Sequence, residues 1–148
     1  MIKGVLVETD LLVEYLLAPV GTVPLLRRLL EVVPCYSTFL QAAEIYGSAQ
    51  EDQERRMVER PLFGLKILGA SSRYATTIGA ILSSATGSFR YRMAIVAAMA
   101  IESGLPVVTD AFIPHLRAIA NLRLVPGEML RDAPTPQVMT ALLEKATA

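Results

Sequence analysis

The sequence has a single cysteine, and its opposite charges are in balance. Fourteen Lys and Arg residues offset fourteen Asp and Glu residues, so the formal net charge is zero. A neutral chain argues against a surface that coats long nucleic acid by charge alone, and any RNA contact is expected to be local. Since Cys35 has no second thiol to pair with, an internal disulfide is excluded and a reducing compartment, the cytoplasm, is expected.

Long apolar runs are also missing. The longest one, residues 93–101, is about half of what a bilayer-spanning helix requires. At the N-terminus, Glu8 and Asp10 interrupt the stretch that would have to be the apolar region of a signal peptide. We therefore expect a chain that is not exported and has no membrane partner.

What the sequence does have is a high apolar content in alternating patterns. Of its 148 residues 53% are hydrophobic and 19% are charged, which fits one α/β domain over residues 1–148 with a single core. Thr38 and Gln41 have the spacing of a capping box, and Pro61 is expected to end the charged helix before it. The predicted strands are residues 3–8, 34–37, 63–68, 105–109 and 122–125. The predicted helices are residues 10–18, 23–33, 51–60, 71–85 and 88–103, together with a helix that opens at Thr38 and a broken helix over residues 112–120.

Strands that alternate with helices predict a mostly parallel sheet covered by helices on both faces. In such sheets, functional sites collect beyond the carboxyl ends of the strands. Glu8 and Asp110 both fall at the end of a predicted strand, and Glu44 lies in the second turn of a helix that starts near the end of another. Asp10 shares the direction of Glu8 if the chain is still extended there. We expect these carboxylates to converge at one rim.

Converging carboxylates repel one another unless a cation lies among them, and Mg²⁺ and Mn²⁺ prefer oxygen ligands. A metal held there would activate water for phosphodiester hydrolysis. The alternative for Asp10 and Asp110 is that each only caps a helix.

Three segments together resemble the motif blocks of the PIN domain family. They are "VLVETDLLVEYLL", "STFLQAAEIYGSA" and "AIVAAMAIESGLPVVTD", in the family's order and at suitable spacing. The resemblance implies a three-layer α/β sandwich. It also implies a divalent-metal ribonuclease, of which some are the toxins of bacterial toxin–antitoxin pairs, and hence RNA and an antitoxin-like protein as partners.

The resemblance carries over unevenly to the site residues. Glu8 matches the first acid of the family, Glu44 the second, and Asp110 the last, while Asp10 takes the place of a Ser or Asn. At the third acidic position the chain has Met93, and a soft, uncharged thioether does not bind Mg²⁺. The implied metal set is therefore Glu8, Glu44 and Asp110, with Asp10 as a replacement for the missing ligand.

Arg90 and Arg92 begin the helix that contains Met93, where a helix already carries partial positive charge. Three interpretations are open: one arginine reaches into the acidic cluster in place of a metal, both bind RNA phosphates as substrate-binding residues, or both are exposed.

Two functions follow from these alternatives. The first is a Mg²⁺- or Mn²⁺-dependent ribonuclease of the kind that includes bacterial toxins, with Glu8, Glu44 and Asp110 as catalytic residues. The second is a degenerate PIN fold that binds RNA or a protein without cleaving. Apolar helices near the N-terminus also predict a homodimer.

Overall fold

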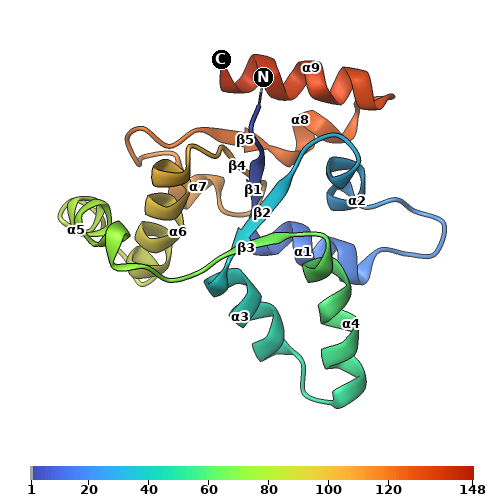
Figure 1. Ribbon diagram of the computed structural model, residues 1–148, viewed down its shortest axis with the longest axis horizontal. Helices are drawn as coiled ribbons and strands as arrows, with labels where there is room; N and C mark the ends of the chain where they lie inside the picture. The colour runs from blue at the N-terminus through green and yellow to red at the C-terminus, as the bar shows by residue number, and fades with distance from the viewer. Residues whose placement is uncertain (1) are drawn as a thin grey trace.

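The computed structural model describes residues 2–148 and has an α/β architecture with one five-stranded sheet (Figure 1). All four strand pairings are parallel, as predicted, and the strand order is β3-β2-β1-β4-β5. The strands are β1 (Val5–Val7), β2 (Cys35–Thr38), β3 (Lys66–Leu68), β4 (Val107–Thr109) and β5 (Leu124–Pro126). The helices are α1 (Thr9–Leu17), α2 (Leu25–Leu30), α3 (Phe39–Ser48), α4 (Asp52–Phe63), α5 (Ala75–Leu82), α6 (Arg90–Ser103), α7 (Ile113–Leu116), α8 (Gly127–Arg131) and α9 (Pro136–Thr147), with a 3₁₀ turn at Ser72–Tyr74.

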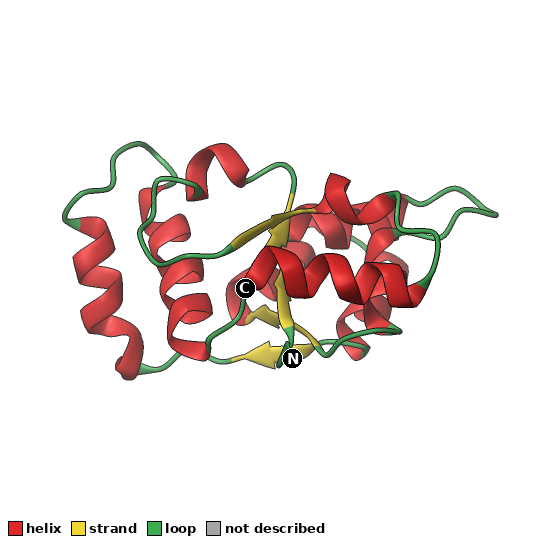
Figure 2. Cartoon of the chain, turned by 90° about the horizontal axis from the view of Figure 1, so that it is seen from above, coloured by secondary structure: helices red, strands yellow, loops and turns green. Residues whose placement is uncertain are grey.

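The central strand β1 is buried on both faces, which explains its continuous apolar sequence. Val5 and Val7 belong to one apolar cluster with residues of α1, α2 and α9, whereas Leu6 belongs to a second cluster with residues of α6. Because side chains alternate along a strand, these clusters lie on opposite faces of the sheet. In Figure 2 the strands run between the α5–α6 pair on one side and the remaining longer helices on the other. The predicted helix–sheet–helix layering is confirmed.

Three segments differ from the prediction. Pro61 does not end its helix: α4 continues to Phe63 with Pro61 buried inside it, because burial against the core outweighs the one hydrogen bond that a proline forfeits. Residues 112–120 form only the short helix α7, in which Pro114 occupies the first turn. The C-terminal helices α8 and α9 were not predicted at all, although Leu130, Met139 and other side chains on them pack into the core.

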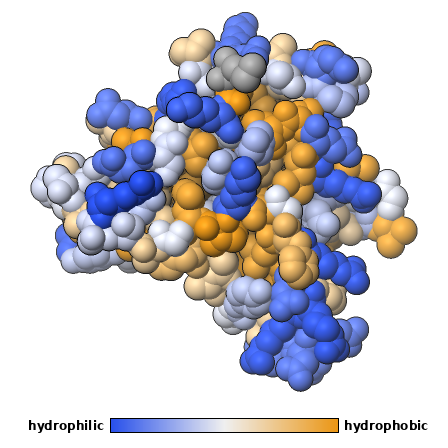
Figure 3. Space-filling view, viewed as in Figure 1, coloured by the Kyte–Doolittle hydropathy of each residue, from blue (hydrophilic) through white to orange (hydrophobic). Residues whose placement is uncertain are grey.

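Helices α3 and α4 project from the body of the molecule (Figure 1). The tip of this projection is strongly hydrophilic in Figure 3, and residues 51–57, at the start of the helix that the sequence marks as charged, are exposed. None of the helices in residues 2–148 is both long and apolar enough to span a membrane.

The strand order reverses between β1 and β4. The chain proceeds from β1 outward to β2 and β3 on one side, and then to β4 and β5 on the other. At such a switch point the loops that leave the two central strands diverge, which creates a crevice at their carboxyl ends. The sequence places acidic residues at this point.

Candidate functional site

Glu8 and Asp110 follow the two strands that flank the switch point. Val7 at the end of β1 pairs with Val108 in β4, so the residues that follow these strands lie at the same edge of the sheet. The common rim that the sequence predicts for the two acids is thus present. The acids nevertheless have different partners, and they form two separate clusters.

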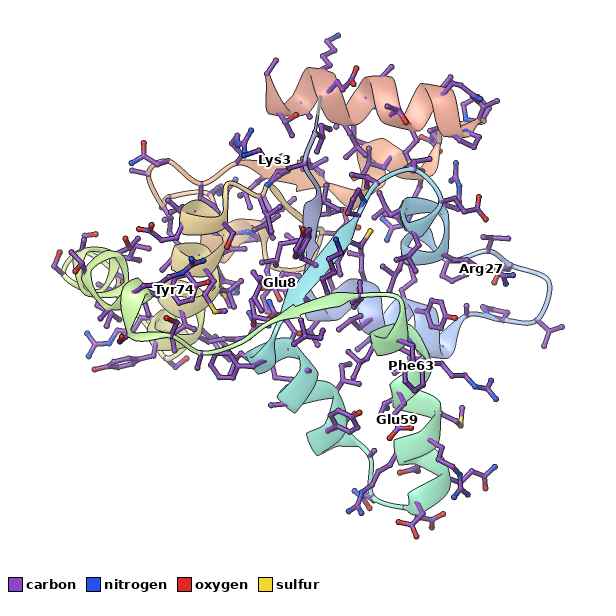
Figure 4. All side chains as sticks on the ribbon, viewed as in Figure 1. Lys3, Glu8, Arg27, Glu59, Phe63 and Tyr74 are labelled. Carbon is purple, nitrogen blue, oxygen red and sulfur yellow. The ribbon has the colours of Figure 1, made fainter. Side chains whose placement is uncertain are left out.

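Glu8 is a fully buried carboxylate. It is the N-cap of α1, and its Oε1 accepts hydrogen bonds from the Thr9 backbone N–H at 3.0 Å and from Gln41 Nε2 at 3.0 Å. Gln41 is oriented by the predicted capping box with Thr38: Gln41 Oε1 accepts a hydrogen bond from the Thr38 backbone N–H. Figure 4 shows Glu8 at the centre of the molecule, beside the central strands. A negative charge at this depth requires a positive partner, because burial of an uncompensated carboxylate is costly.

Arg92 supplies that positive charge. Its Nη1 lies 2.7 Å from Glu8 Oε2 and its Nη2 lies 2.9 Å from Glu8 Oε1. The same guanidinium donates to Glu44, with Nε 2.8 Å from Oε2 and Nη2 2.7 Å from Oε1. Arg92 is therefore bidentate to both carboxylates, a geometry that a planar guanidinium favours. We call Glu8, Glu44 and Arg92 the Arg92 cluster.

The surroundings hold Arg92 in one orientation. Its guanidinium carbon lies 4.2 Å from the centroid of the Phe112 ring, and Nη2 also donates to Thr9 Oγ1 at 3.1 Å. The Arg92 side chain is only 11% exposed, whereas that of Glu44 is 35% exposed. Burial under an aromatic ring makes Arg92 part of the folded framework rather than a mobile surface residue.

The Arg92 cluster also fixes the protonation of its members. Burial by itself raises the pKa of Glu44, but hydrogen bonds from Arg92 and Thr9 and the charge of Arg92 outweigh it and lower that pKa from its ordinary value of 4.5. Burial favours the neutral form of Arg92, yet the hydrogen bonds and charges of Glu8 and Glu44 raise the pKa of its guanidinium on balance. Both groups are ionised at neutral pH.

The lowered pKa of Glu44 predicts an acid-dependent loss of stability. A carboxylate with a lowered pKa in the folded state stabilises the fold fully above its unfolded value, near 4.5, and loses this contribution as the pH falls through the folded value. We expect Glu44→Gln to flatten the decline in unfolding free energy below pH 4.5. At pH 7 it should cost only about 1 kcal/mol, because the pair is partly exposed. Urea unfolding of both proteins at a series of pH values measures this, and parallel acid profiles would contradict it.

Asp10 does not join the Arg92 cluster. Its Oδ1 accepts from Thr109 Oγ1 at 2.8 Å, and its Oδ2 accepts from the backbone N–H groups of Asp110 at 2.9 Å and Ala111 at 3.0 Å. Asp10 therefore holds the backbone of the residues at the end of β4 in place through these hydrogen bonds. It is not the N-cap of α1, since that position belongs to Glu8.

Asp110 is likewise held by its own partners. Its Oδ1 accepts from the Glu128 backbone N–H at 2.8 Å, and its Oδ2 accepts from Arg131 Nη1. The other terminal nitrogen of Arg131, Nη2, donates to Glu14 Oε2. Gly127 permits this contact, because a Cβ at that position would lie 2.7 Å from Asp110 Oδ2. We call Asp110, Glu14 and Arg131 the Arg131 cluster; Asp110 is not an N-cap, as α7 begins after Phe112.

The four predicted metal ligands do not fit a divalent cation as they are arranged. All four carboxylate oxygens of Glu8 and Glu44 accept hydrogen bonds, and Asp10 and Asp110 are bound elsewhere. Within residues 2–148 no three His, Cys, Asp or Glu side chains are grouped so that they could hold a metal ion. The Met93 sulfur lies 3.9 Å from Arg92 Nη1. The position at which the PIN pattern has its third acid therefore adjoins the Arg92 cluster.

Arg90, the other predicted substrate-binding residue, lies outside both clusters. Its guanidinium carbon is 4.9 Å from the centroid of the exposed Tyr91 ring. The two arginines at the start of α6 therefore have different environments, and only Arg92 reaches the acids.

Comparison with solved structures identifies the architecture. A chain of the VapBC2 complex from Rickettsia felis, bound to a DNA fragment from its promoter, matches 85% of this chain and 98% of its own with a TM-score of 0.69 and 21% identity. The chain has a PIN-like fold. Two further chains of the same architecture, each matched over 98% of its length with 17% identity, come from a toxin–antitoxin complex of Klebsiella pneumoniae (TM-score 0.64) and from VapBC-5 of Mycobacterium tuberculosis (TM-score 0.56), each covering 84% of this chain.

No family model matches the sequence, and no curated protein matches it either. At 17–21% identity the likeness shows the PIN-like fold and does not extend to an activity. The site must therefore be interpreted from its own residues.

Sequence reasoning missed the residues that complete the two clusters. Arg131 and Glu14 lie 117 residues apart, and no motif connects them. The sequence contained weak indications that Gln41 and Thr9 belong to the site. A glutamine whose oxygen is used in a capping box still has an amide NH₂ that needs an acceptor, which here is Glu8. A threonine next to Glu8 has its hydroxyl at the same rim of the sheet, where it donates to Glu44.

Proposed function

We propose that this PIN-like protein is a degenerate member of its fold class, in which the Arg92 guanidinium takes the place of a divalent cation, and that it acts by binding a protein partner rather than by metal-dependent cleavage of RNA. The observation that carries the proposal is the bidentate contact of Arg92 with both Glu8 and Glu44. A guanidinium neutralises converging carboxylates, as a metal would, but offers no open coordination position for water or phosphate.

The buried charge of Glu8 favours a permanent role for Arg92. Its departure would leave Glu8, which is fully buried, without a positive partner. A cation that entered from solvent would have to displace Arg92 from five hydrogen bonds to oxygen atoms of Glu8, Thr9 and Glu44. It would also lack the third carboxylate, because Met93 stands at that position.

The second candidate is a Mg²⁺- or Mn²⁺-dependent ribonuclease. The positions of Glu8 and Glu44 at the switch point of a PIN-like fold favour it. It requires Arg92 to swing out of the cluster when metal and RNA bind. In that state both Arg90 and Arg92 would be available for phosphate contacts.

The partner that the comparisons support is an antitoxin-like protein, because the three similar structures described above belong to toxin–antitoxin complexes. One region of the surface is a candidate for binding this partner, and it is equally suited to form the interface of a homodimer. Leu17 at the end of α1 is 75% exposed, and Val20 and Val23 in the loop that follows are at least half exposed. These three exposed apolar side chains lie within seven residues of one another in the sequence, and exposed apolar side chains that gather in one region are typical of surfaces that bind another protein.

Calorimetric titration of Mn²⁺ into the wild-type protein tests the proposal. We expect no saturable heat at millimolar Mn²⁺ and no cleavage of a fluorescent single-stranded RNA under the same conditions. Saturable binding that is lost in Glu44→Gln would overturn the proposal in favour of the nuclease. Glu102→Gln is the matched control, because Glu102 is an exposed glutamate of α6 that belongs to neither arginine cluster, and its replacement should leave both readouts unchanged.

A further inference from the structure

A groove of about 810 Å³ runs along α5 and α6, and Met93 of α6 is part of its lining. Residues 84–89, which follow α5, and residues of the segment from Pro114 to Asn121, which starts inside α7, complete the lining. Figures 1 and 2 both show α5 at one end of the molecule, beside α6. The volume is within the range of pockets that bind small organic molecules, about 300–1,000 Å³.

Ile81, Ile101 and Ile119 form the apolar part of the groove's lining, which also contains polar residues such as Thr77, Ser84 and Asn121. Helix α5, which borders the groove, is short of buried apolar contacts. Helix α5 has the sequence "ATTIGAIL", yet none of its residues is fully buried. An amphipathic or apolar helix normally buries its apolar face against another element. Part of the apolar surface of α5 therefore remains to be covered.

The charge of the groove has one sign. Its lining includes Arg90 and His115 but no Asp or Glu. Within residues 2–148 Arg90 takes part in no ion pair, and its only polar contact is with the Tyr91 hydroxyl at 3.4 Å. The nearest carboxylate along α6 is Glu102, near the opposite end of that helix, where it accepts a hydrogen bond from Thr77. A positive charge at one end and apolar walls along the length define an amphiphilic site.

We propose that this groove binds a small amphiphilic carboxylate, with its hydrocarbon part along Ile81, Ile101 and Ile119 and its carboxylate at Arg90. The exposed Phe89 ring, 5.7 Å from the ring of His115, lies beside Arg90 and provides an aromatic edge for the ligand. A guanidinium without a carboxylate partner gains charge-assisted hydrogen bonds from such a ligand. An apolar chain gains by leaving water.

This site does not depend on the proposed function. Met93 lines the groove, and its sulfur also contacts Arg92, so it forms the wall between the groove and the Arg92 cluster. The residues that hold the ligand, Arg90 foremost, make no contact with Glu8 or Glu44 among the hydrogen bonds of that cluster.

Titration of octanoate into the full chain, followed by calorimetry and by NMR of the methionine and isoleucine methyl groups, tests the inference. Octan-1-ol and octylamine are the matched probes without negative charge. We expect saturable octanoate binding that perturbs Met93 and Ile81. Arg90→Gln should weaken octanoate about tenfold, the loss of roughly one charged hydrogen bond, and leave octan-1-ol unchanged. Arg117→Gln, an exposed arginine outside the groove, is the control and should bind octanoate like the wild type.

A second variant separates binding in the groove from binding elsewhere. Ala80 is exposed and lines the groove, so Ala80→Trp should fill it without disturbing the core and abolish binding of both octanoate and octan-1-ol. Circular dichroism of each variant verifies the fold. No saturable octanoate binding by the wild type would overturn the proposal, as would equal affinity in Arg90→Gln or in a folded Ala80→Trp. The Mn²⁺ titration reports on different residues, so failure of one proposal leaves the other standing.

Discussion

Replacing Arg92 with alanine is expected to lower the free energy of unfolding by about 3–5 kcal/mol, the typical cost of removing one partner from a buried ion pair. The physical reason is Glu8, which is fully buried and keeps only the Thr9 N–H and the Gln41 amide as donors once Arg92 is gone. These neutral groups do not compensate a full negative charge. Urea unfolding at pH 7 measures the effect.

Arg90→Ala is the matched control for this variant, since Arg90 lies two residues away on the same helix and makes no ion pair within residues 2–148. Its effect should stay within about 0.5 kcal/mol. The double variant Glu8→Gln/Arg92→Met removes both charges and should recover much of the loss. A cost below about 1 kcal/mol for Arg92→Ala would show that Glu8 is not held by Arg92 in solution.

A second large effect is expected from restoring the acidic pattern. In the double variant Arg92→Ala/Met93→Asp the guanidinium is removed and a third carboxylate is placed next to Glu8 and Glu44. Carboxylate oxygens are the ligands that Mn²⁺ and Mg²⁺ prefer. We expect this variant to bind Mn²⁺, which should raise its unfolding free energy by about 2.7 kcal/mol at a concentration one hundred times the dissociation constant.

The wild type is the reference for this gain, because Mn²⁺ should leave its thermal unfolding unchanged. Each single variant tests one component: Arg92→Ala lacks the third carboxylate, and Met93→Asp keeps the guanidinium. Mn²⁺ should therefore stabilise the double variant more than either of them. Equal stabilisation of the wild type would mean that Arg92 is no barrier to the metal.

The architecture could be predicted from the sequence because it depends on local patterns. Strands such as residues 105–109 are short, β-branched and bounded by a turn and an acid, and each is followed or preceded by a helical period. The elements that escaped prediction depend on distant contacts. The buried side chains of helix α9, Met139 and Leu143, belong to the same apolar cluster as Val5 and Leu11, which lie more than a hundred residues away in sequence. Pro61 is buried inside α4, which the residues around it in the sequence do not indicate.

The candidate site was predictable in its location but not in its charge balance. Glu8 and Asp110 could be placed at one rim because parallel strands align their carboxyl ends. Which cation neutralises Glu8 depends on side-chain direction, and the sequence does not distinguish Arg90 from Arg92 in this respect. Only the latter points inward. Arg131 belongs to α8, a helix that was not predicted, so its contact with Asp110 could not be predicted from the sequence.

The position of β1 in the centre of the sheet also bears on the order of events during synthesis. Strand β1 is made before both of its partners and pairs first with β2, but its other edge stays open until β4, about a hundred residues later, has been added. Arg92 is made late as well, so the Glu8 carboxylate remains hydrated while the first half of the chain exists alone. A pairing between strands that are distant in sequence costs loop-closure entropy before its contacts form. While the sheet is incomplete, its unpaired apolar edge is therefore exposed to other chains.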